Sequence, residues 1–164
     1  MPATTISEVI TQLDEIVKQA GQNSDRAGYF AALYKKVTVA VSIKINEKFF
    51  DDNARMEKLD VVFANRYLEA YQQYKNGLPC SAVWQHAFDA TRTWKPIVID
   101  HLIAGMNAHI GLDLGIATAT VAPGNLINAV HDDFNKINTV LNGLVNEVKT
   151  DLFAMWPFSK IISK

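Results

Sequence analysis

The chain has 164 residues, of which 49% are hydrophobic and 20% charged, a balance that suits one globular domain with a sizeable core. Its formal net charge of −1, without a dense cluster of Lys and Arg, argues against a nucleic-acid partner. The single Cys80 excludes an intramolecular disulfide, and no secretory signal is recognisable near the N-terminus, so we expect a cytoplasmic location.

Three helices are predicted in the first half of the chain. The first covers about residues 5–20, where apolar residues recur at helical spacing and Thr5 or Ser7 can cap the N-terminus. The second covers about residues 26–48. Its VTVAVSIKI run could also form a short strand, but the 3.6-residue pattern on both sides favours a helix. The third covers about residues 54–75 and ends at Asn-Gly.

Three further helices are predicted in the second half. A short one covers about residues 81–94, and a strongly apolar one follows over 97–117. A break at 118–124 separates it from a long last helix over 125–155, which leaves a C-terminal tail at 156–164. The sequence therefore predicts an all-α fold, a single domain over residues 1–164 with a bundle of about six helices around the central apolar helix.

The apolar helix is long enough to cross a membrane, at about 20 residues. It contains Asp100, His101, His109 and Asp113, and so many ionisable groups would be costly in a lone span. We therefore expect no transmembrane segment and interpret this helix as the buried centre of a soluble bundle.

His109 and Asp113 stand four residues apart on this helix, so their side chains lie on one face and can meet. They could hydrogen-bond, with His109 as a general base oriented by Asp113, or jointly hold a metal ion. A buried hydrogen-bonded pair that only fixes helix packing fits the spacing equally well. Packing alone does not require the pair, so it is the main candidate for a site.

The break at 118–124 predicts an antiparallel hairpin of the last two helices. Counting outward from its centre brings the HDD segment, His131 to Asp133, to the height of the His109–Asp113 pair. Imidazole and carboxylate ligands together suit zinc, iron, manganese or nickel. The candidate metal ligands are therefore His109, Asp113, His101, Asp60, His131 and Asp133. Acidic residues early in a helix also stabilise it, which is the alternative for the HDD segment.

Asp60 interrupts an otherwise apolar and aromatic stripe on the third helix, which includes Phe63, Tyr67 and Tyr71. A buried carboxylate needs a partner, because leaving it unpaired costs several kcal/mol. A histidine or a metal on another helix would suit it, and so would an arginine, for which the candidates are Arg26, Arg55 and Arg92.

Three strings of the sequence, RMEKLDVVFANRYLEA, WQHAFDA and HLIAGMNAHIGLDLGIA, resemble a bacterial family catalogued as a domain of unknown function, DUF5995. The resemblance covers most of residues 5–150, and its most specific element is N-x-H-I-x-x-D-L. It implies an all-helical fold and supplies no activity. It also implies that the family's motif strings include Asp60, Asn65, Arg66, Asn107, His109 and Asp113.

Two functions are compatible with these features. The first is an enzyme, metal-dependent or using His109 and Asp113 for acid–base chemistry, that acts on a small, largely apolar molecule in a cavity of the bundle. The second is a non-catalytic binding or scaffold protein, in which the same polar residues form a structural network. A homo-oligomer is compatible with both.

Overall fold

The computed structural model describes residues 1–93 and 97–155, with the backbone alone for 145–149 and 151–155. The predicted tail at 156–164 lies outside the described residues. No strand occurs in the described part, and the all-α prediction is confirmed. The elements are α1 (Ile6–Asn23), α2 (Gly28–Asn46), α3 (Asn53–Lys75), α4 (Ala82–Thr91), α5 (Val98–Ala108), the π-helix η1 (His109–Asp113), α6 (Leu114–Val121), the 3₁₀ helix η2 (Gly124–Val130) and α7 (His131–Met155).

The elements α5, η1 and α6 follow one another without a break and form one apolar helix over Val98–Val121. With these three taken together, the described structure has the six helices that the sequence predicts. By length and composition alone this helix could cross a membrane, a test that the core helix of a soluble protein also passes. It extends a few residues beyond the predicted end at 117.

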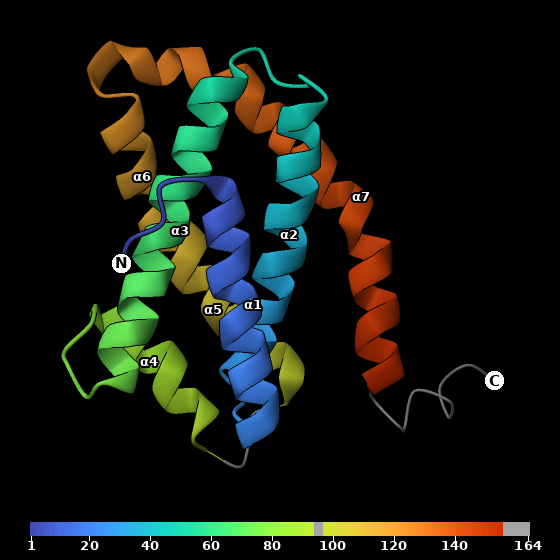
Figure 1. Cartoon of the computed structure of the whole chain (residues 1–164). Helices are drawn as coiled ribbons and strands as arrows, with labels where there is room; N and C mark the ends of the chain where they lie inside the picture. The colour runs from blue at the N-terminus through green and yellow to red at the C-terminus, as the bar shows by residue number, and fades with distance from the viewer. Residues whose placement is uncertain (94–96, 156–164) are drawn as a thin grey trace.

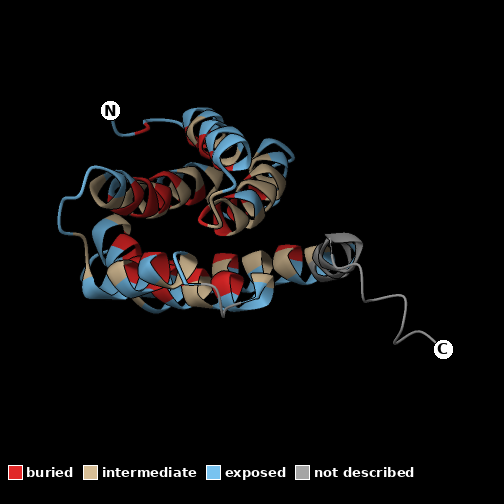
Figure 2. Cartoon of the chain, turned by 90° about the horizontal axis from the view of Figure 1, so that it is seen from below, coloured by how far each residue is buried: buried red, intermediate tan, exposed pale blue. Residues whose placement is uncertain are grey.

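The helices α2 and α3 form the middle of the molecule (Figure 1). On one side α1 packs against both of them, and on the other lie the α5–α6 helix and α7 (Figures 1 and 2). The short α4 packs against α3 and α5 at one end. Buried residues face the interior between these layers, as Figure 2 shows, and the core is built mainly from α1, α2, α3 and α4.

Local sequence explains most helix boundaries. The side chains of Thr5, Asp52 and Ser81 each accept a hydrogen bond from the backbone N–H three residues ahead, which caps α1, α3 and α4. The β-branched run in α2 is helical, so the strand interpretation is wrong. Tertiary packing overrides β-propensity there, because Thr38 and Val41 are buried at helical spacing.

The predicted hairpin of the last two helices is wrong in its geometry. The chain does not turn directly from α6 into α7, because residues Gly124–Val130 form a 3₁₀ helix that runs across the top of the molecule (Figure 1). The last α-helix therefore begins at His131 rather than at Asn125, and it packs mainly against α2. The levels obtained by counting along a tight hairpin do not apply, so His131 and Asp133 are not brought to the His109–Asp113 pair.

A glycine allows α5 to approach α2 closely. A Cβ built on Gly105 would overlap the ring of Phe30, a core residue that also lines the cavity described below. We expect Gly105→Ala to lower the free energy of unfolding by about 1–3 kcal/mol through overpacking. In Gly115→Ala the added methyl meets no atom within 4 Å, and helix propensity should raise stability by about 0.5–1 kcal/mol. Urea unfolding of both variants measures the contrast, and equal effects would contradict this packing.

Candidate functional site

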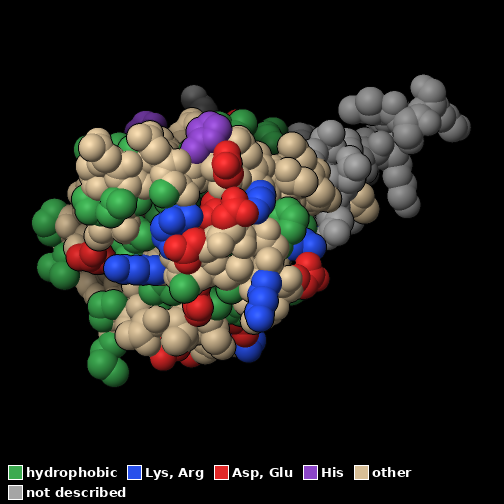
Figure 3. Space-filling view, turned by 90° about the horizontal axis from the view of Figure 1, so that it is seen from above, with side chains coloured by type: hydrophobic (Ala, Val, Ile, Leu, Met, Phe, Trp, Pro, Cys, Tyr) green, Lys and Arg blue, Asp and Glu red, His purple; other side chains and the backbone are tan. Residues whose placement is uncertain are grey.

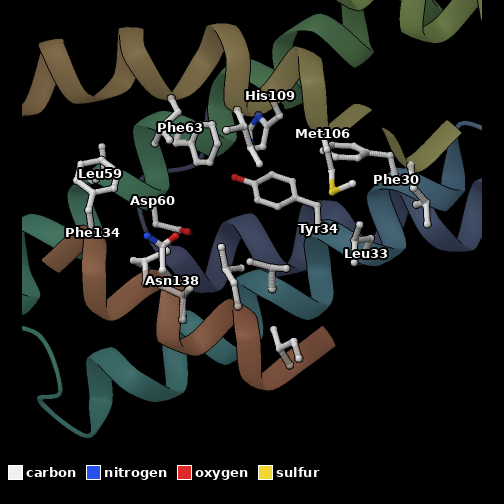
Figure 4. Close-up of a pocket in the computed structure, with 18 of the residues that line it drawn as sticks. Phe30, Leu33, Tyr34, Leu59, Asp60, Phe63, Met106, His109, Phe134 and Asn138 are labelled. Carbon is white, nitrogen blue, oxygen red and sulfur yellow. The ribbon is translucent and has the colours of Figure 1, made fainter. Parts of the chain in front are cut away.

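A cavity of about 430 Å³ lies between α2, α3, the α5–α6 helix and α7 (Figure 4). This volume is within the range of pockets that hold small ligands. The cavity exists because α7 stands away from the α5–α6 helix and both contribute to its wall. The apolar lining includes Phe30, Leu59, Phe63, Met106, Phe134 and Ile137.

Four polar residues interrupt this apolar lining, namely Tyr34, Asp60, His109 and Asn138. The Tyr34 hydroxyl, Asp60 Oδ2 and His109 Nε2 are buried and have no hydrogen-bond partner among the described residues. The Thr38 hydroxyl lies one helical turn from Tyr34 and lowers the pKa of Tyr34 slightly against the larger effect of burial. Neither hydroxyl has a partner in hydrogen-bond geometry. Because buried polar groups are nearly always paired in folded proteins, three unpaired groups in one cavity point to a missing partner.

The apolar helix contains one π-helical turn at the site. In η1 the Leu114 N–H donates to the His109 carbonyl, five residues back, instead of four as in an α-helix. Single π-helical turns within α-helices are frequent at functional sites. This turn carries both His109 and Asp113, and both are buried.

Asp113 is held by three donors from three different elements. Arg66 Nε on α3 donates to Oδ1 at 2.9 Å, and Trp84 Nε1 on α4 donates to Oδ2 at 2.7 Å. His109 Nδ1 lies 3.3 Å from Oδ2, which confirms the predicted contact. Burial opposes ionisation, but the hydrogen bonds from His109, Trp84 and Arg66 outweigh it and place the pKa of Asp113 below its ordinary value. The carboxylate is therefore ionised at neutral pH.

The ring of His109 is fixed by aromatic contacts. It stacks on Phe63 with the ring centroids 3.5 Å apart and the planes 7° apart, and Tyr34 packs edge-on at 4.4 Å. Burial outweighs the opposing effect of Asp113 and lowers the pKa of His109, so the imidazole is neutral at pH 7. Because the ionised Asp113 only accepts hydrogen bonds, Nδ1 carries the proton and Nε2 is an acceptor, on a ring that lines the cavity.

Asp60 lines the cavity opposite this pair (Figure 4). Burial, with a further contribution from Glu57, raises the pKa of Asp60 to about 7. The arginines suggested as its partners are engaged elsewhere: Arg55 with Asp133, Arg92 over the Tyr74 ring, and Arg26 with the Thr93 carbonyl.

The other candidate ligands lie apart from the cavity. His101 is buried on α5, where its ring lies 6.1 Å from that of Tyr29. His131 is exposed beside Asp132. Figure 3 shows histidine and acidic side chains at the surface of the upper face. Among the side chains that the structure describes, those of residues 1–93, 97–144 and 150, no three His, Cys, Asp or Glu are grouped as a metal site would need.

Asp133 on α7 makes hydrogen bonds to residues at the start of α3. Its buried carboxylate accepts from the backbone N–H groups of Asp51 and Asp52, and Arg55 Nη2 donates to it at 2.9 Å. We expect Asp133→Ala to lower the free energy of unfolding by about 3 kcal/mol, because it leaves two backbone N–H groups without an acceptor and removes the buried carboxylate that pairs with Arg55. Thermal and urea unfolding measure this loss, and the matched exposed change Asp132→Ala should cost less than about 0.5 kcal/mol. Equal losses in the two variants would contradict the anchoring role.

Sequence reasoning did not assign Tyr34, Arg66 or Trp84 to the site, although Arg66 belongs to the motif strings of the family resemblance. Tyr34 follows Phe30 by one helical turn on α2, which places both on the buried face. Arg66 and Trp84 are separated from Asp113 by 47 and 29 residues, and no local pattern signals such contacts.

The model of a family of unknown function, DUF5995, matches residues 6–164 of the chain. The matched range includes every element that lines the cavity, from α2 to α7. No curated protein and no solved structure matches the chain.

Proposed function

We propose that this chain, which belongs to the DUF5995 family, binds a small, mainly apolar molecule in its cavity and that His109 accepts a hydrogen bond from the polar group of that molecule. One observation carries the proposal. His109 lines the cavity, its Nε2 is buried and has no partner among the described residues, and its Nδ1 is held by Asp113.

The roles of the two residues follow from their charges. In the resting state the neutral imidazole donates from Nδ1 to Asp113 and presents its lone pair at Nε2. A ligand O–H or N–H that donates to Nε2 polarises the imidazole, and the adjacent carboxylate at Nδ1 strengthens Nε2 as an acceptor. Asp113 keeps its own charge because Arg66 and Trp84 also donate to it.

This arrangement supports a ligand-binding role for the His109–Asp113 pair better than it supports a metal site or a purely structural network. Asp113 is surrounded by donors, including a guanidinium, and such surroundings suit an anion that stays an anion rather than a cation ligand. An unpaired buried nitrogen costs about 1–3 kcal/mol, and Nε2 differs from the equally unpaired ring nitrogens of His101 in belonging to a residue that lines the cavity.

Two ligands of similar shape test the proposal. 2-Phenylethanol has one hydroxyl donor, and ethylbenzene has the same apolar body without it. In calorimetric or NMR titrations we expect 2-phenylethanol to bind about tenfold more tightly, which is the effect of one buried hydrogen bond.

The variant His109→Asn keeps a donor near the position of Nδ1 and removes Nε2, so it should abolish the preference for the alcohol. The exposed change His131→Asn is the matched control and should keep it. Absence of binding by either ligand, or an undiminished preference in His109→Asn, would contradict the proposal.

A further inference from the structure

We propose that the ligand of the cavity carries a protonated primary amine on an apolar body, and that Asp60, Tyr34 and His109 bind the ammonium group. This inference rests on the proposed function, because it names the ligand class of the same cavity.

Three unpaired hydrogen-bond acceptors in the cavity indicate a ligand with several donors, such as a primary amine. Asp60 Oδ2, the Tyr34 hydroxyl oxygen and His109 Nε2 are three buried atoms that can each accept a hydrogen bond. In Figure 4 the Tyr34 hydroxyl points into the space between His109 and Asp60. A primary ammonium has three N–H donors and no acceptor, so it matches three acceptors around one space.

The charge of the lining favours a cation over an anion. Asp60 is the one carboxylate among the lining residues that the structure describes, and none of these residues is a lysine or an arginine. A ligand carboxylate would have no cationic partner there. An ammonium would pair with Asp60 and could also contact the faces of aromatic rings such as Phe63 and Phe134.

The surroundings of Asp60 set its response to pH. The titratable groups that face it are Glu57 on its own helix, Tyr34 on α2 and His109 on η1. The described lining side chains of α7 are uncharged, and Asn138 is the polar one among them. Burial raises the pKa of Asp60 to about 7, so binding of an ammonium ion below that pH displaces a proton from the carboxyl group into solvent.

The experiment compares 2-phenylethylamine, 2-phenylethanol and 3-phenylpropanoate, which share an apolar body and differ in charge. At pH 8 we expect the amine to bind about tenfold or more tightly than the alcohol, and the carboxylate to bind least tightly. Between pH 6 and pH 8 the affinity for the amine should rise about tenfold, as Asp60 ionises.

The variant Asp60→Asn should remove both the preference for the amine and its pH dependence. Glu57→Gln, one turn away and outside the lining, is the control and should change the affinity by less than about threefold. Equal affinities for amine and alcohol at pH 8, or amine binding that weakens as pH rises, would overturn the inference. If 2-phenylethanol still binds through His109 in that case, the proposed function stands, and if no ligand binds, both fail.

Discussion

Replacing Asp113 by alanine should lower the free energy of unfolding by about 3–5 kcal/mol, one of the two largest effects expected in this chain. The change leaves the Arg66 guanidinium without its carboxylate and the Trp84 indole N–H without an acceptor. It also releases His109, which is only 3% exposed and has no other hydrogen-bonding partner in the described structure. Urea unfolding monitored by circular dichroism measures the loss.

The matched control is Asp132→Ala. Asp132 also contacts a histidine, His131 at 3.1 Å, but both side chains are largely exposed. An exposed ion pair contributes about 0–1 kcal/mol, so this change should be nearly neutral. If Asp113→Ala cost no more than Asp132→Ala, the buried network would not be the structural centre of the site.

Replacing Asp60 by asparagine should have the opposite effect and stabilise the protein at pH 8, by roughly 3–5 kcal/mol. The pKa of Asp60 is raised from 3.8 to about 7 in the folded chain. At pH 8 the folded protein must therefore hold a buried carboxylate that the unfolded chain would hydrate. Asparagine has nearly the same shape and carries no charge, so it avoids this cost.

The sign of the pH dependence follows from proton binding. Between about pH 4 and pH 7 the folded state keeps the Asp60 proton and the unfolded state releases it, so stability falls as pH rises. The contribution of Asp60 is about 1.4 kcal/mol per pH unit in that window and constant above it. Asp60→Asn should therefore gain little at pH 4 and most at pH 8.

Urea unfolding at pH 4, 6 and 8 measures this trend in both proteins. The control Glu57→Gln removes a nearby acidic group that is itself outside the cavity lining, and it should give a much smaller gain. A loss of stability in Asp60→Asn at pH 8 would mean that the carboxylate has a partner in the folded chain. The expected gain would instead identify Asp60 as a group that destabilises the fold and is suited to a ligand.

Much of the fold could be predicted from local signals. The Thr5 cap of α1 and the apolar helix after residue 97 follow from capping chemistry and from composition, and both are confirmed. The His109–Asp113 contact also followed from spacing, because residues four apart on a helix meet whether the turn is regular or slightly wide.

A cavity in the bundle was predicted, but its position and lining could not be, because α7 contributes to its wall only in the packed structure. The 3₁₀ segment Gly124–Val130, which separates α6 from α7, was predicted as the first turns of the last helix. The contacts of Asp113 with Arg66 and Trp84 could not be predicted either, because these residues meet only when their helices have packed together. Tertiary packing decides such contacts, and single-sequence periodicity does not report them.

The protonation of His109 tests the central claim most directly. In protein labelled with ¹⁵N-histidine, long-range ¹H–¹⁵N spectra at pH 7.5 distinguish a protonated ring nitrogen from an unprotonated one. We predict that Nδ1 of His109 carries the proton, that Nε2 is unprotonated, and that the Nε2 resonance shifts when 2-phenylethanol is added. A proton on Nε2, or an Nε2 resonance that the alcohol leaves unchanged, would contradict the account.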